Sequence, residues 1–295
     1  MAEMGRKRLG ELVRKVFEIL LNHPDGMPAK DALAQLEKSI ALSEFEKSDY
    51  PNRPGVRRFE KIVRFATISA VKAGWLVKSK GKWILTEDGK TAFKNYKDPD
   101  EFKKQANQLY KKWKAAQPDS VDENIEEGTA ESASTTLEEA EELAWAEIEK
   151  YLKNVNPYDL QALVAALLKA MGYHVSWTSP PGPDKGIDIL AYADPLGTKT
   201  PRIKVQVKRH DAAISVDGLR SFMAVLGDQD VGIFVSTGGF TSAAEQEART
   251  QEKRKVTLVD LEKLFDLWVQ HYDKITESEK RLLPLKPVYY IAATE

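Results

Sequence analysis

Cysteine is absent from this sequence of 295 residues, and it contains only four histidines. The chain can therefore form no disulfide and no thiolate metal site, and a histidine-rich zinc site is disfavoured. No apolar run reaches the roughly 18 residues that a membrane-spanning helix needs. The charged N-terminus, MAEMGRKRLGELVRKVFEIL, also lacks the apolar core of a signal peptide. We therefore expect a cytoplasmic protein with no membrane partner.

Positive and negative charges are unevenly distributed behind a net charge of −1. Residues 1–115 hold 25 Lys and Arg against 15 Asp and Glu, residues 116–150 hold 1 against 12, and residues 151–295 hold 18 of each. A basic front part followed by an acidic segment predicts a polyanionic partner such as nucleic acid. The alternative interpretation is a charge bias that serves only solubility.

The first hundred residues predict three amphipathic helices and a β-hairpin. Apolar residues recur at helical spacing within 8–22, 29–42 and 57–74, and SDYPNRPG between the last two predicts a loop. WLVKSKGKWIL then predicts two short strands joined by a turn. Three helices and a β-hairpin are the elements of a winged helix, a helix-turn-helix variant. We assign residues 1–97 to a winged-helix DNA-binding domain, an α+β fold.

Residues 98–136 are predicted to connect this domain to the next. A helical extension fits residues 98–115. The segment that follows, AQPDSVDENIEEGTAESASTT, is acidic and nearly free of large apolar side chains, which is typical of a flexible linker. An ordered acidic helix is the alternative. A further hypothesis is that residues 118–135 shield the basic domain until DNA competes for it.

Residues 137–275 predict an α/β domain with a mixed sheet flanked by helices. Strands are expected at 174–178, 186–194 and 202–209, the last two as a hairpin, and then at 231–237 and 255–260 in alternation with helices. Residues 276–295 are left as a C-terminal tail.

The polar face of one predicted strand needs a functional explanation. In IKVQVKRH, residues 203–210, apolar residues alternate with Lys204, Gln206 and Lys208. If this strand forms a hairpin with the preceding one, Asp188 lies on the same face, near Gln206 and Lys208. Carboxylate and amide oxygens suit Mg²⁺, and a nearby lysine can polarise a metal-bound water or neutralise charge during phosphodiester hydrolysis. The alternative is a surface ion pair that contributes about 0.2–1 kcal/mol.

These motifs together resemble the catalytic domain of the Mrr family of restriction endonucleases, a branch of the PD-(D/E)XK nuclease fold. Within residues 157–270 the resemblance is carried by LVAALLKAMGY, GPDKGID, ADPLG and VQVKRH. It implies that Asp188, Gln206 and Lys208 are catalytic. It also implies that Asp188, Gln206 and Val207 hold a metal ion, with Mg²⁺ or Mn²⁺ as the cofactor. Where the family has a Glu on the first helix, this chain has Gln161, which supplies less charge and is counted with the catalytic set.

The front part is similar to the winged-helix module that often precedes this catalytic domain, through FATISAVKAGWLVKSKGKWILTEDG. Together the two resemblances imply a restriction endonuclease that hydrolyses foreign, modified (methylated) double-stranded DNA in phage defence. Cutting both strands needs two sites, so a homodimer or higher homo-oligomer is expected.

The cations expected to contact DNA lie on the third helix, on the loop before it, on the hairpin and at the end of the catalytic strand. They are Arg53, Arg57, Arg58, Lys61, Arg64, Lys78, Lys80, Lys82 and Arg209. A recognition helix needs such cations for phosphates. A basic face that is merely solvated is the alternative.

Two other functions remain open from the sequence. One is a non-cleaving reader of modified DNA or a regulator with a degenerate nuclease fold, which Gln161 favours and the intact Asp188, Gln206 and Lys208 disfavour. The other is a structure-specific nuclease of repair or recombination, which a sequence-searching winged helix disfavours.

Overall fold

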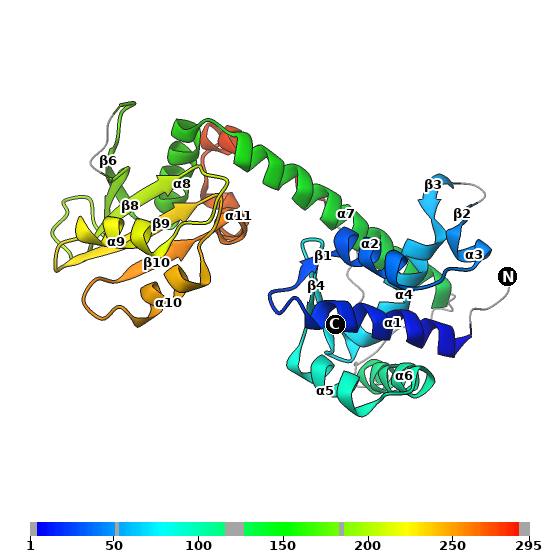
Figure 1. The fold of residues 1–295 in the computed structure, drawn as a ribbon. Coiled ribbons are helices and arrows are strands. Elements are labelled where there is room, and N and C mark those ends of the chain that lie inside the picture. The colour runs from blue at the N-terminus through cyan, green and yellow to red at the C-terminus, as the bar shows by residue number, and fades with distance from the viewer. Residues whose placement is uncertain (1–4, 51–52, 116–126, 183–185, 289–295) are drawn as a thin grey trace. The chain divides into compact units, whose positions relative to one another are not determined.

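The computed structural model describes residues 5–50, 53–115, 127–182 and 186–288 (Figure 1). This part of the chain divides into two compact units, the first ending at Ala146 and the second beginning at Glu147. Across the described residues, no helix combines the length and the apolar character that crossing a membrane would require.

The first unit combines helices with short strands. Its elements are α1 (Arg6–Leu21), β1 (Met27–Pro28), α2 (Ala29–Ser39), α3 (Glu44–Lys47), β2 (Asp49–Tyr50), β3 (Arg53–Arg57), α4 (Arg58–Lys72), β4 (Leu76–Ser79), β5 (Lys82–Leu85), α5 (Glu87–Asn95) and α6 (Pro99–Ala115). Strands β4 and β5 form the hairpin that the sequence predicts, and β1 adds to its edge in the order β1-β5-β4. The stretch predicted as a loop before α4 instead contains the antiparallel pair β2 and β3.

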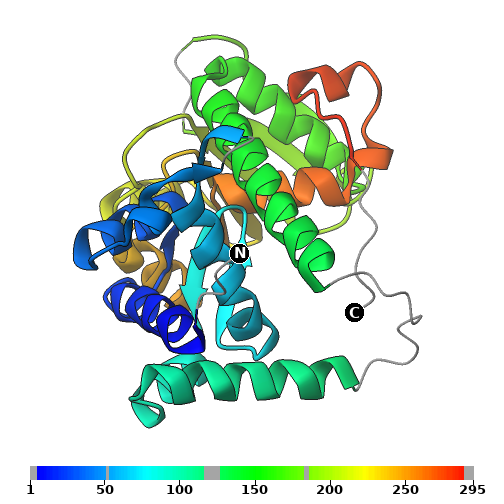
Figure 2. The ribbon, with the colours of Figure 1, turned by 90° about the vertical axis from the view of Figure 1, so that its right-hand side faces the viewer.

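The core of the first unit lies where α1 meets its neighbours. Leu12, Val16 and Leu20 recur at helical spacing on α1 and are each at most 1% exposed. Phe17 meets Phe102 of α6 edge to face at 5.2 Å between ring centroids. Helix α6 therefore lies alongside α1 and is part of this core rather than a mere extension (Figures 1 and 2).

Helix α7 (Glu127–Asn154) begins within the stretch that the sequence predicts to be linker. The linker was predicted to run to residue 136, whereas helix already begins at Glu127. From Glu127 onward the alternative, an ordered acidic helix, describes the chain. Composition misled the prediction because small and acidic residues are typical of linkers, yet Ala and Glu also favour helix. Residues 116–126 lie outside the described part of the chain.

The second unit is a mixed five-stranded sheet with helices. After the end of α7, its elements are α8 (Pro157–Ala170), β6 (His174–Thr178), β7 (Ile189–Tyr192), β8 (Arg202–Lys208), α9 (Val216–Ala224), β9 (Asp230–Ser236), α10 (Ser242–Thr250), β10 (Val256–Val259), α11 (Leu261–Gln270) and the 3₁₀ turns η1 (Tyr272–Lys274) and η2 (Glu279–Leu282). The strand order is β10-β9-β8-β7-β6. β8, β9 and β10 are parallel, whereas β6, β7 and β8 are antiparallel. The predicted mixed α/β sheet is confirmed.

The register of β8 with β9 shows which sheet face carries the polar row. Lys204 pairs with Gly232, and Gln206 pairs with Phe234, so these residues share one face. A methyl group at Gly232 would come within 2.8 Å of Phe222 on α9. Helix α9 therefore packs against the same face that carries Gln206, farther along the strands.

A buried carboxylate joins the start of β9 to β8. The Asp230 side chain is 4% exposed, and its oxygens lie 2.8 Å from Nε of Arg202 and 2.8 Å from Nζ of Lys204. The backbone N–H of Gly227 also donates to it at 2.7 Å. Burial alone would raise the pKa of Asp230, but hydrogen bonds from Arg202 and Lys204 outweigh burial and hold that pKa well below its usual range.

The substitution Asp230→Asn should destabilise the second unit by about 3 kcal/mol at neutral pH, because it leaves two cations without their buried partner. Since the folded pKa is depressed, this stabilisation is present above the unfolded pKa of about 3.9 and is lost as the pH falls below it. Urea unfolding from pH 7 to pH 3 should therefore show a smaller difference between wild type and variant at acid pH. The exposed Asp228→Asn serves as the matched control. A loss that is the same at every pH would contradict this role.

Candidate active site and candidate nucleic-acid interface

The pairing of β7 with β8 ends next to Asp188 and Gln206. Ile189 pairs with Val205, and the backbone N–H of Asp188 donates to the Val205 carbonyl at 2.8 Å. Asp188 directly precedes Ile189 and Gln206 directly follows Val205, so the two residues adjoin the last pair of the ladder. Both side chains are nearly buried, with 6% and 7% exposed. A carboxylate and an amide thus lie together at the point where β7 begins.

The Asp188 carboxylate is anchored to the backbone of β8. Its Oδ2 accepts a hydrogen bond of 2.7 Å from the N–H of Val207. In a strand, the N–H and C=O of one residue point to the same side, so the Val207 carbonyl also points towards the side of Asp188. Carboxylate, amide and backbone carbonyl oxygens are therefore available at one edge.

Gly186 passes close to this pair. It has a positive φ of 79°, and a Cβ at this position would lie 3.5 Å from Nε2 of Gln206. A left-handed backbone is strained for other residues, so the glycine permits the approach of this loop to Gln206. Residues 183–185, just before it, lie outside the described part.

The two lysines of the polar row differ in their surroundings. Lys208 follows Gln206 by two residues, so it lies on the same face of β8 as Gln206, and it is exposed. Lys204, by contrast, donates to the Val225 carbonyl at 2.7 Å and pairs with Asp230. The structure therefore brings Lys208 to the end that holds Asp188 and gives Lys204 a bonding role within the unit.

Gln161 is connected to Asp188 through the backbone of Ser179. Gln161 lies on α8, is 6% exposed, and its Nε2 donates to the Ser179 carbonyl at 2.7 Å. The Ser179 N–H in turn donates to the Asp188 carbonyl at 2.7 Å. A glutamate could not donate the first of these bonds when ionised. Ser179 was not singled out from the sequence, because nothing in the local pattern marks a backbone bridge.

The oxygen donors at this edge fit a divalent cation. Among the described residues, no group of three or more His, Cys, Asp or Glu side chains could hold a metal ion. Asp188 is thus joined by neutral oxygens of Gln206 and Val207 rather than by a second carboxylate. Such hard oxygen ligands suit Mg²⁺, which keeps several of its waters and needs few protein ligands.

Arg209, expected to contact DNA, has a protein partner. Its Nη1 donates at 3.2 Å to the carbonyl of Lys153, in the last turn of α7. A cation at a helix C-terminus is favoured by the helix dipole. The side chain is nevertheless exposed.

The cations at the start of α4 also have partners. Arg57 donates to Glu37 at 2.8 Å, and its Nη1 lies 3.9 Å from Glu60. The Arg58 guanidinium lies over the ring of Phe45, 4.5 Å from its centroid. The side chain of Arg53, at the first residue of β3, lies outside the described part.

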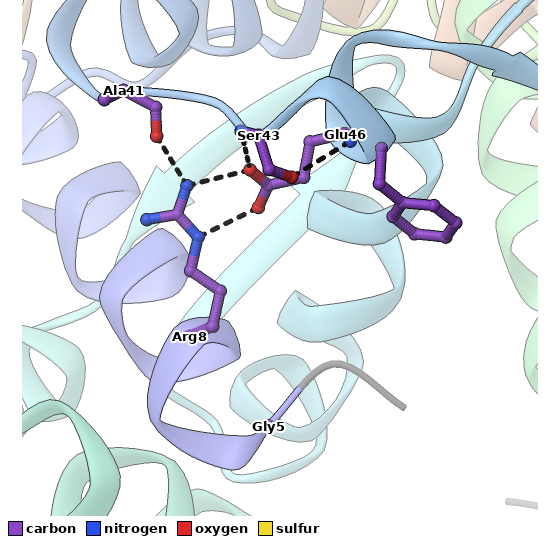
Figure 3. Close-up of a pocket in the computed structure, with 6 residues that line it drawn as sticks. Gly5, Arg8, Ala41, Ser43 and Glu46 are labelled. Carbon is purple, nitrogen blue, oxygen red and sulfur yellow. Dashed lines mark hydrogen bonds and ion pairs between the residues drawn. The ribbon is translucent and has the colours of Figure 1, made fainter. Parts of the chain in front are cut away.

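Phe45 also borders an open pocket of about 330 Å³ (Figure 3). The polar groups that line it bond to one another. Arg8 donates from Nε to Glu46 at 2.9 Å and from Nη2 to the Ala41 carbonyl at 2.8 Å, and the Ser43 N–H donates to Glu46 at 2.7 Å. Since Glu46 is 2% exposed and well bonded, this cluster is best explained as the element that fixes α3 to α1.

The later cations of the predicted recognition surface face glutamates of α7. Nζ of Lys61 lies 2.5 Å from Glu139. Arg64 lies 2.7 Å from Glu138 and 2.5 Å from Glu142. These glutamates all lie in the part of α7 that belongs to the first unit.

Glu138 also reaches the hairpin. It accepts hydrogen bonds from Nζ of Lys78 at 2.7 Å and from Nε1 of Trp83 at 2.8 Å. Burial lowers the pKa of the Lys78 amine to about 8, although the Glu138 carboxylate opposes the shift. Farther along, Nζ of Lys80 lies 5.4 Å from the ring centroid of Trp145, and Lys82 is half-buried on β5.

The hairpin and α7 make direct backbone contact. A Cβ at Gly81, in the turn between β4 and β5, would lie 3.1 Å from Cα of Glu142. The α7 helix thus packs against the hairpin turn at a place that only glycine leaves open. Nothing in the sequence pattern indicated the partners of this part of α7.

Comparison with known proteins provides two matches to families and one to a curated relative. Residues 152–268 match a family described as restriction endonuclease, and residues 10–95 match one described as the Mrr N-terminal domain. The chain is 26% identical over 293 residues to the type IV methyl-directed restriction enzyme EcoKMrr of Escherichia coli (strain K12), covering 88% of this chain and 91% of the relative.

One solved structure is also similar. It is the MspJI restriction endonuclease in complex with a 27-mer oligonucleotide, at 15% identity and a TM-score of 0.35, with 69% of this chain and 52% of that chain covered. This chain therefore spans about half of that protein.

The packing of α7 on the hairpin can be tested with a matched pair of glycine substitutions. Gly81 and Gly74 have φ values of 71° and 74°, so alanine adds similar backbone strain at each. A methyl at Gly81 meets α7, whereas one at Gly74 meets nothing within 4 Å. In urea unfolding, Gly81→Ala should therefore lose about 1 kcal/mol more than Gly74→Ala. Equal losses would contradict this contact.

Proposed function

We propose that this chain, which belongs to the Mrr family of restriction endonucleases and is a DNA endonuclease, cleaves modified double-stranded DNA. We also propose that cleavage requires Mg²⁺ or Mn²⁺. Restriction endonuclease domains generally use divalent metal ions. The observation that carries the proposal is the buried pair of Asp188 and Gln206 at the edge where Val207 and Lys208 also lie.

In the proposed site, different residues of the second unit bind the metal ion and neutralise charge on the phosphate. Asp188, Gln206 and the Val207 carbonyl are the oxygen ligands for the cation. A bound divalent cation supplies positive charge to the phosphate and an activated water. The exposed ammonium of Lys208, on the same face, neutralises charge that develops on the phosphate oxygens in the transition state. The Val207 N–H holds Asp188 in its orientation.

Gln161 is proposed to support this site by fixing the chain before Asp188. Its hydrogen bond to Ser179, and the bond from Ser179 to Asp188, hold the end of β6 against the start of β7. This arrangement gives Gln161 a use that does not need the charge of a glutamate. Gln161 was the feature that favoured a protein that binds modified DNA without cleaving it. With this supporting role, Gln161 no longer indicates lost activity.

The first unit is proposed to be a winged-helix domain that binds DNA. Its element order supports this, with helices α1, α2 and α4 followed by the β4–β5 hairpin, and β1 at the edge of that hairpin. In such a domain α4 is the recognition helix and the hairpin is the wing. The cations proposed to contact phosphates are those of α4, the hairpin and the neighbouring positions, namely Arg53, Arg57, Arg58, Lys61, Arg64, Lys78, Lys80, Lys82 and, in the second unit, Arg209.

Dependence on modified DNA is proposed from the relative, whose name describes it as methyl-directed. A role in phage defence in the cytoplasm is proposed with it. Because each chain holds one such site and a duplex has two strands, we also propose that the active form is at least a homodimer.

A plasmid cleavage assay tests the proposed function. Methylated and unmodified plasmid are incubated with Mg²⁺, with Mn²⁺ or with a chelator, using wild type, Asp188→Asn and Lys208→Met. We expect cleavage of methylated plasmid that needs the metal ion and falls at least about 100-fold in both variants, since each removes charge that acts at the phosphate.

Two exposed positions in the same unit provide the controls, Asp228→Asn and Lys253→Met, which should cleave like wild type. Cleavage of both plasmids would support the proposed nuclease activity but reject its dependence on methylation. Retained DNA binding without cleavage under any condition would reject the nuclease and favour the reader.

A further inference from the structure

The acidic segment of α7, defined here as Glu138, Glu139 and Glu142, lies on the surface proposed to bind DNA. Its carboxylates form ion pairs with Lys61 and Arg64 of α4 and with Lys78 of the hairpin. These three cations are among those proposed to contact phosphates. In a winged-helix domain, the recognition helix and the wing are the parts that face DNA. A helix that bridges the two therefore covers the expected interface.

The three cations cannot serve α7 and DNA at the same time. The side chains of Arg64, Lys78 and Lys61 are 5%, 11% and 19% exposed where α7 lies on them. A phosphate needs a direct approach to the guanidinium or ammonium group to form a charge-assisted hydrogen bond. With the acidic segment in place, those groups are already bonded and largely removed from solvent.

The contacts between the acidic segment of α7 and the surface of α4 and the hairpin include several ion pairs, beside apolar residues such as Leu137, which borders a pocket with Ile68. Leu143, the large apolar residue beside Glu142, is 68% exposed and so does not face the hairpin. The carboxylates instead place negative charge where phosphate oxygens would lie. Interactions of this kind can be exchanged for equivalent ones with DNA, and the exchange is sensitive to salt.

We infer that the acidic segment of α7 is an internal competitor for DNA, which must leave α4 and the hairpin before the first unit can bind DNA tightly. The inference rests on the proposed function, since it assumes that this surface binds DNA. It differs from shielding by the linker of residues 118–135, because the competing carboxylates lie beyond that segment, on an ordered helix with defined partners.

The competitor can be neutralised by Glu138→Gln, Glu139→Gln and Glu142→Gln in one triple variant. Affinity for a short duplex is measured by fluorescence anisotropy in the full chain with Asp188→Asn added, so that cleavage does not interfere. We expect the triple variant to bind about 5- to 150-fold more tightly, the range typical of coupling between two binding events. Its affinity should also fall more steeply with salt, by up to about 0.9 in the log–log slope for each freed cation.

The matched control removes three negative charges elsewhere. Glu147→Gln, Glu245→Gln and Glu252→Gln change exposed glutamates outside the first unit, so they report any general effect of net charge. Unchanged or weaker binding by the competitor variant relative to this control, with the fold intact by circular dichroism, would overturn the inference. Adding Arg64→Ala to the triple variant should abolish most of the gain.

A second experiment holds the competitor in place and compares one variant with itself, before and after a bridge is cleaved. The chain has no cysteine, so Lys61→Cys and Glu139→Cys introduce the only two thiols, at side chains that are in contact in the native protein. Bridging them with a short cleavable crosslinker should weaken DNA binding at least about fivefold relative to the same variant after the bridge is cleaved. Equal affinity with and without the bridge would overturn the inference.

The failure of this inference is distinguishable from the failure of the proposed function. If the chain binds and cleaves DNA but the triple variant behaves like its control, the nuclease stands and the competition is rejected. If wild type, triple variant and control all fail to bind or cleave DNA, the proposed function itself is rejected.

Discussion

The antiparallel pairing of β7 with β8 is the interaction on which the candidate site depends. It ends at the pair of Ile189 and Val205, which Asp188 and Gln206 adjoin, and the Asp188 carboxylate accepts a hydrogen bond of 2.7 Å from the Val207 N–H. Alternation along β8 places Lys208 on the same face as Gln206. The parallel pairing of β8 with β9 then fixes β8 at the centre of the sheet, with the Asp230 ion pairs joining the two strands. The positions of Asp188, Gln206 and Lys208 thus follow from the arrangement of these strands.

Much of this arrangement could be predicted because it is local. The alternation in IKVQVK indicates a strand, and the short connection to the preceding strand favours a hairpin, so the shared face of Asp188 and Gln206 follows. The same pattern could not separate Lys204 from Lys208. That distinction depends on Asp230, which reaches Lys204 only once β9 lies beside β8. The bond of Gln161 to Ser179 likewise depends on how α8 packs, which local periodicity does not determine.

The ion pairs on the surface of the first unit could not be predicted from the sequence either. The sequence identified a basic helix and hairpin and an acidic stretch farther along, but the order of charges does not say which cation meets which anion. The structure pairs Lys61, Arg64 and Lys78 with glutamates of α7. Residues expected to face DNA are therefore bonded within the protein. A basic row alone did not distinguish an open DNA-binding face from one occupied by another part of the chain.

Calorimetric titration with Mn²⁺ shows whether Asp188 and its neighbours form a divalent-cation site. The full chain is compared with Asp188→Asn, whose amide oxygen can still accept the hydrogen bond from Val207, so the local fold is kept while the charge is removed. We expect Mn²⁺ to bind to the wild type and to bind to the variant at least about tenfold more weakly. Equal binding by both proteins would contradict this expectation.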